Sequence, residues 1–272
     1  WWPRISVHLS GGETDMQRLR LLPPVIIAHR GYRKRYPENT LAAFTAAFDA
    51  GVGMVEVDVT LTRDRRVVVL HDNTLDRTTD GRGQARGFTL EELKQLDAGS
   101  WFDPRFAGER LPTLEEVLDL CAARGMVNIE IKAGAFEAGR LPGAIEEQVL
   151  TAVTERGMGD RVLISSFEAR FLTRIVDRPD APTVGVLTER RSGSDPLGLC
   201  KRLQAFSWHP DFRSVTAARV RAMHAAGIMV FPYTVNQPED FRRLLQMGVD
   251  GIFTDDPPLL QTVIGRAAGK EA

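Results

Sequence analysis

Two acidic residues two positions apart, Glu56 and Asp58, lie within the apolar run "MVEVDVT" from Met54 to Thr60. In a β-strand, residues i and i+2 share a face, so both carboxylates lie together and the valines lie opposite. Buried carboxylates need a cationic partner or a metal ion. An exposed strand face would carry the same acids without either. The motif alone therefore leaves metal ligation and a solvated face as equal alternatives.

The run "VNIEIKA" repeats this pattern, with Glu130 and Lys132 on one face. These two residues could form a structural ion pair, but Glu130 would also be a third carboxylate beside Glu56 and Asp58. Three oxygen ligands with open positions suit Mg²⁺ or Ca²⁺. No cluster of soft ligands indicates zinc. We therefore expect one divalent cation, Mg²⁺ or Ca²⁺, at these acids.

A second polar group ends the first apolar run, which closes on "AHRG" at His29, Arg30 and Gly31. The glycine permits close approach of backbone or substrate. The guanidinium of Arg30 can bind a phosphate through paired hydrogen bonds. His29 could act as an acid or a base near neutral pH.

The second candidate histidine, His71, depends on the register of a hairpin. Only "TLTRDRR" separates the strands expected at 54–60 and 67–71, which is too short for a crossover between parallel strands. We therefore predict an antiparallel pair. A turn at 64–65 would place His71 opposite Asp58 on the same face. A core histidine bonded to Asp58 or Asp72 is an equally good interpretation of His71 taken singly.

The remaining chain alternates short β-rich runs with helical patterns, which is typical of parallel strands in βα units. We expect strands at Val25–His29, Met54–Thr60, Val67–His71, Val127–Lys132, Val162–Ser166, Thr183–Leu187, Ala205–His209, Met229–Thr234 and Gly251–Thr254. With one hairpin among them, about eight strand–helix units remain, which predicts an α/β fold of the TIM (β/α)8 type. The active site of such a barrel lies at the carboxyl ends of its strands.

The expected domain organisation is one barrel at 23–265 with a small insertion at about 73–111. The insertion is rich in turn residues, and long loops of this kind usually serve function. Trp101 and Phe102 are expected to be its apolar anchor. Residues 1–22 are expected to be a poorly structured N-terminal extension.

The composition of the chain limits which classes of partner we expect it to bind. The chain has 35 basic and 36 acidic residues, a balance that gives no support for nucleic-acid binding. It has no apolar run long enough for a spanning helix, so we expect no stable membrane insertion. Cys121 and Cys200 are expected to be buried free thiols, which favours a reducing, cytoplasmic location. The oligomeric state stays open.

A set of ordered motifs resembles the glycerophosphodiester phosphodiesterase family. The motifs are "AHRG", "PENTLAAF", "VEVDVTLTRDRRVVVLHD", "LDRTTDGRG", "LDAGSWF", "LPTLEEVL", "NIEIK", "SSF", "YTVN" and "GIFTDDP", and they run from Ala28 to Pro257. The form of "YTVN" and the lack of a leader are most similar to the cytosolic bacterial members.

This resemblance implies a TIM barrel that hydrolyses glycerophosphodiesters to sn-glycerol 3-phosphate and an alcohol. It implies a divalent metal at Glu56, Asp58 and Glu130. The other implied roles are general acid/base catalysis by His29 and His71, phosphate binding by Arg30 and Lys132, and contact with the glycerol or the leaving group by Phe167 and Tyr233.

Other polar residues have structural interpretations. Glu38 and Asn39 are expected to open the first helix by capping and dipole effects. Asp255 is expected to close the last strand near the site, and His209 to be a wall residue rather than a catalyst. The basic run 33–35 is expected to be a solvated loop that attracts anionic substrates.

Several functional alternatives stay open at this point. A lyase on a related barrel, such as a phosphoinositide phospholipase C or a sphingomyelinase D, would share the paired acids and two histidines, although "IEIK" and "YTVN" argue against it. Lysophospholipids are a further substrate option. A non-catalytic anion-binding barrel could lose motif residues, but all motif positions are filled here. The nucleophile, water or the glycerol 2-hydroxyl, is not determined, nor is the histidine that acts first.

Overall fold

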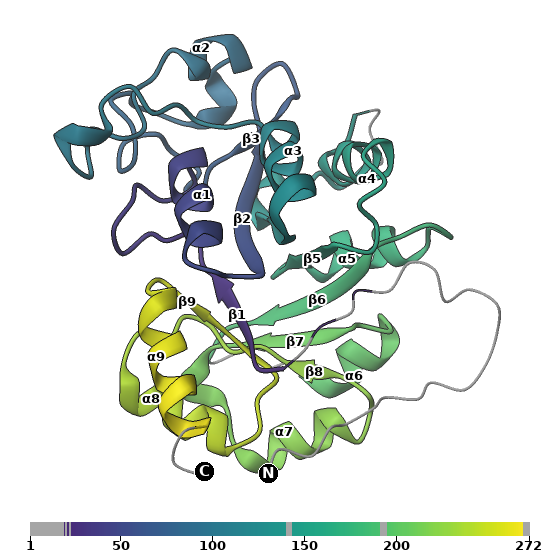
Figure 1. Cartoon of the computed structure of the whole chain (residues 1–272). Helices are drawn as coiled ribbons and strands as arrows, with labels where there is room; N and C mark the ends of the chain where they lie inside the picture. The colour runs from purple at the N-terminus through teal and green to yellow at the C-terminus, as the bar shows by residue number, and fades with distance from the viewer. Residues whose placement is uncertain (1–18, 20, 22, 140–142, 191–194, 269–272) are drawn as a thin grey trace.

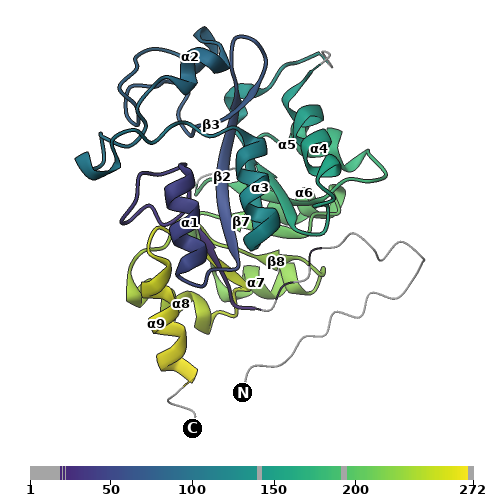
Figure 2. The ribbon, with the colours of Figure 1, turned by 45° about the horizontal axis from the view of Figure 1, so that its top comes forward.

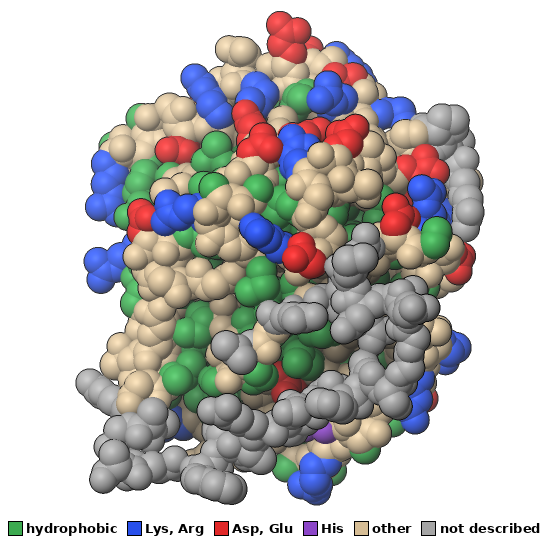
Figure 3. Space-filling model, turned by 45° about the vertical axis from the view of Figure 1, so that its right-hand side comes forward, with side chains coloured by type: hydrophobic (Ala, Val, Ile, Leu, Met, Phe, Trp, Pro, Cys, Tyr) green, Lys and Arg blue, Asp and Glu red, His purple; other side chains and the backbone are tan. Residues whose placement is uncertain are grey.

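The structure is a computed structural model of the chain, and it describes residues 19, 21, 23–139, 143–190 and 195–268. The extension expected at 1–22 lies almost wholly outside the described residues. No helix among the described residues is both long and apolar enough to cross a membrane. On the face shown in Figure 3, basic and acidic side chains are interspersed, in keeping with the balanced composition.

The described strands form one sheet that curves into a barrel (Figures 1 and 2). They are β1 (Val25–Ala28), β2 (Met54–Leu61), β3 (Val67–Val69), β4 (Met126–Ile131), β5 (Val162–Ser166), β6 (Thr183–Thr188), β7 (Ser207–Pro210), β8 (Met229–Val230) and β9 (Gly251–Thr254). The order is β8-β7-β6-β5-β4-β2-β1-β9, all parallel, with β3 antiparallel to β2. Backbone hydrogen bonds of 3.0 Å from Asp250 to Val230 and from Phe253 to Pro232 join the two ends. The predicted TIM-type barrel is confirmed.

The helices are α1 (Leu41–Asp49), α2 (Leu90–Lys94), α3 (Leu114–Arg124), α4 (Ile145–Glu155), α5 (Ala169–Val176), α6 (Pro196–Arg202), α7 (Ala217–His224), α8 (Pro238–Gln246) and α9 (Pro257–Ala268), with 3-10 helices at Ala85–Gly87, Pro104–Phe106, Ala133–Ala135 and Phe212–Ser214. All the α-helices except α2, which lies in the insertion, cover the outside of the sheet (Figure 1). The main apolar core fills the layer between sheet and helices. It includes Cys121 and Cys200, which are free and buried as expected.

A second apolar cluster, which includes Met54, Leu163 and Phe253, is contributed by strands on opposite sides of the ring. Since side chains alternate along a strand, Glu56 and Asp58 share the face of Met54 and follow it toward the carboxyl end of β2. Every residue of β2 is buried, so the solvated-face alternative for these acids is wrong. The strand positions them inside the barrel mouth.

The expected hairpin register is wrong by one residue. Leu70, not His71, lies opposite Asp58, because the Leu70 amide donates to the Asp58 carbonyl at 3.0 Å. Arg65 adopts a positive φ of 58°, which gives a three-residue turn in place of the expected two. His71 nevertheless reaches the site, since β3 ends before it and the chain turns there toward the insertion.

The insertion between β3 and α3 has its own small core. Its buried residues are Val68, Leu70, Leu75, Ala85, Leu93, Ala98 and Leu111. Trp101 and Phe102 are not among them, and Trp101 is 38% exposed. The expectation that these two aromatic residues anchor the insertion is therefore wrong. Aliphatic side chains fill the space beneath the loop, and the two aromatic rings meet edge to face at 5.6 Å nearer the surface.

The glycine of "AHRG" allows α1 to pack against the end of β1, and a substitution there is expected to be costly. Gly31 has φ +83°, and a β-carbon on it would lie 2.7 Å from the backbone of Ala43 in α1. We predict that Gly31→Ala destabilises the fold by about 2–4 kcal/mol, from strain plus overlap. Urea unfolding of the purified variant measures this loss.

Gly157 supplies the matched control for this prediction. It also has a positive φ, +60°, but a β-carbon there meets nothing within 4 Å. Gly157→Ala should therefore cost only the backbone strain, about 1–2 kcal/mol. Equal losses in the two variants would contradict the close packing of Gly31 on α1.

Candidate active site

The nine residues singled out in the sequence all lie at or near the carboxyl ends of barrel strands, or in the loops that follow. They are His29 and Arg30 after β1, Glu56 and Asp58 in β2, His71 after β3, Glu130 and Lys132 at the end of β4, Phe167 after β5, and Tyr233 after β8. Parallel strands bring these ends to one side of the barrel, which is the side where such folds place their active sites.

The three predicted acids form one cluster. Asp58 and Glu130 are register partners in adjacent strands, and each of the three acids offers an oxygen within 4.8 Å of the others. All three side chains are buried, and Glu56 Oε1 has no hydrogen-bond partner among the described residues. An orphaned carboxylate oxygen beside two further acids is the donor set that a hard divalent cation requires. The cluster could therefore hold one such ion.

Burial and repulsion among the three carboxylates raise the pKa of two of them, Glu56 and Glu130. Burial, followed by the charges of Asp58 and Glu130, raises the pKa of Glu56 well above its usual value. Burial and the Asp58 charge likewise raise the pKa of Glu130 to about 7. Burial acts the same way on Asp58, but the charges of Lys132 and Arg30 outweigh it and hold that pKa low. A bound cation would relieve the repulsion among these carboxylates.

Two cations flank the acid cluster. Lys132 Nζ lies 2.6 Å from Glu130 Oε1 and 3.1 Å from Asp58 Oδ1. Arg30 has a positive φ of 57°, and its backbone amide donates to Glu56 Oε2 at 2.7 Å, while its Nε lies 3.2 Å from Asp58 Oδ2. An anion that enters this site meets both positive charges beside the acids.

His29 is held by a carboxylate from the far end of the chain. Its Nδ1 lies 2.7 Å from Oδ1 of Asp255, whose Oδ2 accepts from the Asn236 side chain at 2.7 Å. Because the carboxylate accepts, Nδ1 carries the proton and Nε2 is left available. Burial and the Arg30 charge lower the His29 pKa to about 4, so the ring is neutral at pH 7. Asp255 was expected only to close the last strand, but it also orients this histidine.

His71 is held in the same way. Its Nδ1 lies 2.6 Å from Oδ1 of Asp72, whose Oδ2 accepts from Arg77 Nε at 2.7 Å. Burial lowers the His71 pKa, and the Asp58 charge opposes that shift. Both histidines thus keep Nε2 free for a reacting group. The sequence offered Asp72 as a partner of His71 only under the core-histidine interpretation, and it gave no sign that Arg77 would hold Asp72.

Glu38 and Asn39 do not cap α1, contrary to expectation. The cap is Thr40, whose hydroxyl accepts from the Ala43 amide at 3.2 Å. Asn39 has φ +57° and donates to Asp58 Oδ2 at 2.9 Å. Glu38 is buried and accepts from Arg30 Nη1 at 2.7 Å. Since the following threonine is itself a good cap, the sequence held a signal that these two polar side chains were free for the site.

The basic run 33–35 is only partly a solvated loop. Lys34 and Arg35 are exposed. Arg33, in contrast, lies 3.0 Å from Glu38 and 3.8 Å from Asp255. His209 is the wall residue that was expected, fully buried with its Nε2 at 2.8 Å from Ser207 Oγ.

Glu38 makes the folded protein sensitive to acid. Burial would raise its pKa, but hydrogen bonds from Arg77 and the charges of Arg30 and Arg33 lower it to about 2. A lowered folded-state pKa stabilises the fold above the unfolded pKa of 4.5, and this is lost as pH falls toward 2. The contribution is at most about 3 kcal/mol.

We therefore predict that Glu38→Gln lowers the free energy of unfolding at pH 6 and that its deficit shrinks toward zero near pH 2. Urea unfolding at pH 6, 4 and 3 measures this. Solvent-exposed Glu91 in α2 gives the matched control, since Glu91→Gln removes the same charge from the surface and should not reproduce the loss expected for Glu38→Gln. A deficit that is independent of pH would contradict the electrostatic explanation.

Two aromatic residues border the acid cluster. Phe167 is 38% exposed, and its ring meets the Tyr233 ring edge to face at 5.8 Å. The Tyr233 hydroxyl donates to the Thr188 carbonyl at 3.0 Å, which fixes the ring. Burial and the charges of nearby acids, among them Glu130, raise the Tyr233 pKa. The rings thus form an apolar edge beside the charged site.

A TIM barrel whose mouth combines clustered acids, two oriented histidines and two cations belongs, by fold and site, with the enzymes that act on phosphate esters. Comparison with known proteins makes this specific. A sequence model of the "Glycerophosphoryl diester phosphodiesterase family" matches residues 29–259. The chain therefore belongs to this family, and the predicted enzyme class, a phosphoric diester hydrolase, is confirmed.

Individual relatives support the same family assignment. A glycerophosphodiester phosphodiesterase of Caldanaerobacter subterraneus subsp. tengcongensis is 42% identical over 88% of this chain and 97% of its own length. A glycerophosphodiester phosphodiesterase of Bacillus altitudinis is 39% identical over 85% of this chain and 94% of its own length. A solved phosphodiesterase of Oleispira antarctica, in complex with the product sn-glycerol-3-phosphate, is 31% identical with a TM-score of 0.76, covering 89% of this chain and 97% of that one.

Proposed function

We propose that this chain hydrolyses glycerophosphodiesters to sn-glycerol 3-phosphate and an alcohol, with one Mg²⁺ or Ca²⁺ ion and with His29 and His71 as general acid and base. The observation that carries the proposal is the convergence of three buried acids and two carboxylate-held histidines at one barrel end. The product in the Oleispira antarctica neighbour supports the assignment of glycerol phosphate.

The metal and phosphate sites follow from the contacts. Glu56, Asp58 and Glu130 would hold the cation, which would supply positive charge to the phosphoryl oxygens. Arg30 and Lys132 would bind the same oxygens, because their cationic groups already point at the acid cluster. Charge that grows on the phosphoryl group during the reaction would thus meet fixed positive groups.

The two histidines would divide the proton transfers. With Nδ1 of each ring fixed on a carboxylate, Nε2 of one would take the proton of the nucleophile, and Nε2 of the other would donate to the leaving alkoxide. The nucleophile is water or the glycerol 2-hydroxyl, which would form a cyclic phosphate that water then opens. Phe167 and Tyr233 would lie against the glycerol or the leaving group.

A panel of diesters tests the proposal. Choline, ethanolamine, glycerol and inositol diesters are assayed for release of sn-glycerol 3-phosphate, in EDTA and with added Mg²⁺ or Ca²⁺. We expect release only with the metal. A cyclic phosphate as the final product would favour the lyase alternative, and phosphate binding without turnover would favour the non-catalytic barrel. Release of lysophosphatidic acid from lysophospholipids would extend the substrate range.

We also propose a cytoplasmic location, on the basis of Cys121 and Cys200. Both thiols are buried and unpaired, and burial raises the pKa of each to about 12. Free structural thiols are typical of reducing compartments. Cell fractionation with an antibody to the chain tests this location.

A further inference from the structure

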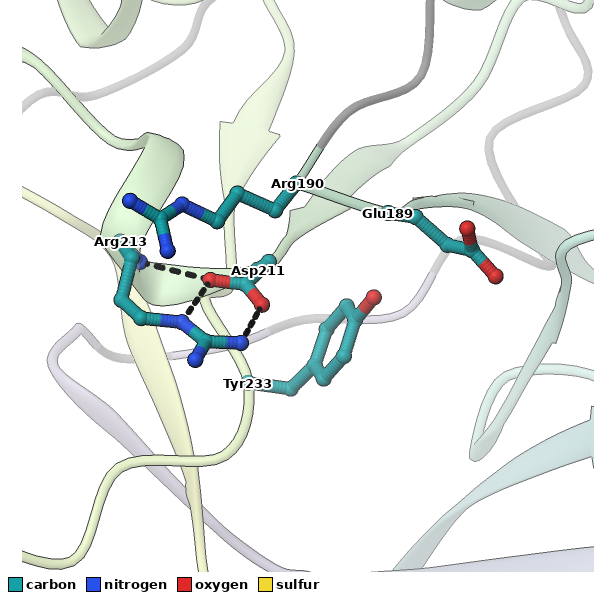
Figure 4. Close-up of a pocket in the computed structure, with 5 residues that line it drawn as sticks. All are labelled: Glu189, Arg190, Asp211, Arg213 and Tyr233. Carbon is teal, nitrogen blue, oxygen red and sulfur yellow. Dashed lines mark hydrogen bonds and ion pairs between the residues drawn. The ribbon is translucent and has the colours of Figure 1, made fainter.

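A second recess opens beside the acid cluster, at the carboxyl ends of β6, β7 and β8 (Figure 4). Its volume is about 350 Å³. Among the described residues, it is lined by Glu189, Arg190, Asp211, Arg213 and Tyr233. None of the acids proposed for the metal contributes to it, so it is a separate subsite.

Tyr233 connects this recess to the proposed active site. Its ring forms one wall of the recess and also meets Phe167 edge to face at 5.8 Å. Of the acids proposed for the metal, Glu130 acts on this ring, since its charge adds to burial and Asp211 in raising the pKa of Tyr233. A group that extends from a phosphate at those acids past the two aromatic rings therefore enters the recess.

The charges in the recess are unevenly paired. Asp211 accepts from the backbone amide and Nε of Arg213, both at 2.9 Å, so its charge is balanced. In Figure 4 the Arg190 guanidinium lies on the Asp211 side, and the Glu189 carboxylate lies on the other side of Tyr233. Among the described residues, no cation pairs with Glu189. Within the described part of the chain, the Arg190 guanidinium has no ion-pair partner either, so the recess offers a carboxylate on one side of the tyrosine ring and a cation on the other.

We propose that this recess binds the leaving alcohol of the substrate and that Glu189 selects alcohols that carry an ammonium group. The proposal rests on the proposed function. An ammonium is attracted by the carboxylate and by the face of the tyrosine ring, whereas a neutral polyol gains neither attraction. The ammonium can be primary, as in ethanolamine, or quaternary, as in choline.

The test compares kcat/KM of wild type and Glu189→Gln on four diesters. We expect a fall of up to about five-fold for glycerophosphoethanolamine and glycerophosphocholine, since Glu189 is exposed and this is the upper end for an exposed charge pair. For glycerophosphoglycerol and glycerophosphoinositol, we expect a change below about two-fold. Glu189→Lys should lower the two ammonium diesters further. A change that is equal for all four diesters, or absent from all, overturns the proposal.

Glu155→Gln is the matched control, because it removes the same charge from an exposed site at the end of α4, at the amino end of the barrel. It should leave all four rates unchanged. If kcat/KM of Glu189→Gln falls for only one of the two ammonium diesters, the alcohol of that diester, ethanolamine or choline, is the one that Glu189 selects.

The experiment distinguishes failure of the proposed function from failure of the proposed role of Glu189. If wild type releases glycerol phosphate from none of the diesters, the catalytic proposal is wrong. The role of Glu189 is then tested by the affinity of the protein for a diester. Calorimetric titration with glycerophosphocholine should give tighter binding to wild type than to Glu189→Gln. Equal affinities overturn the selection of ammonium by Glu189.

Discussion

Replacing His29 or His71 by alanine is expected to lower kcat by about 10²–10⁴-fold, the range for loss of a general acid or base. Each ring has Nδ1 on a carboxylate, at 2.7 Å for His29 and 2.6 Å for His71, and so offers only Nε2 to the substrate. Steady-state release of sn-glycerol 3-phosphate measures the loss. Circular dichroism and thermal melts establish that each variant is folded.

A diester with a p-nitrophenyl leaving group separates the two roles. Because p-nitrophenolate leaves without being protonated, the variant that lacks the acid should recover most of its rate on this substrate, whereas the variant that lacks the base should not. His224 supplies the control, since it pairs with Asp250 at 2.8 Å at the end of α7, away from the acid cluster. His224→Gln should keep full turnover. Full activity in either active-site variant would refute the assignment.

Replacing Glu56 by glutamine is expected to abolish metal-dependent turnover and, in EDTA, to make the protein more stable. Glu56 is repelled by Asp58 and Glu130, and no group in the described part of the chain donates to its Oε1, so the charge is unfavourable without a cation. Relief of this repulsion should raise the free energy of unfolding by about 1 kcal/mol, a fraction of what one buried charge costs. Activity should fall by at least about 100-fold.

Thermal melts with and without Mg²⁺ or Ca²⁺ measure both effects. Wild type should be stabilised by the metal, because a ligand that binds only the folded state shifts the unfolding equilibrium. Glu56→Gln should lose that shift. The control is Glu146→Gln, since Glu146 is also buried but pairs with Arg174 at 2.7 Å. It should be less stable in both conditions and keep the metal shift. A destabilised Glu56→Gln that still responds to metal would contradict the proposed site.

The barrel and the shared face of Glu56 and Asp58 could be predicted because both depend on local periodicity. Alternation along one strand places Glu56 and Asp58 together, whatever the rest of the chain does. The hairpin register could not be predicted in the same way. One residue in the left-handed conformation, Arg65, shifts the whole ladder, and nothing in "TRDRR" distinguishes a two-residue from a three-residue turn.

The partners of the catalytic candidates were the least predictable part of the site. Asp255 binds His29 across 226 positions of sequence, and Arg77 bridges Glu38 and Asp72 from inside the insertion. Glu38 and Asn39 stood in the sequence as ordinary cap residues, and the structure turned both toward the site. Interactions of this kind depend on where loops from different strands end.

The amino-acid sequence alone thus determined the strand–helix alternation, the residue types of the site and the faces on which the acids lie, because each follows from the geometry of one element. Only the tertiary structure decided which carboxylate holds each histidine, which cation neutralises which acid, and that Glu189 is left unpaired beside Tyr233 among the described residues. These depend on distances between elements, and closure of the barrel sets those distances.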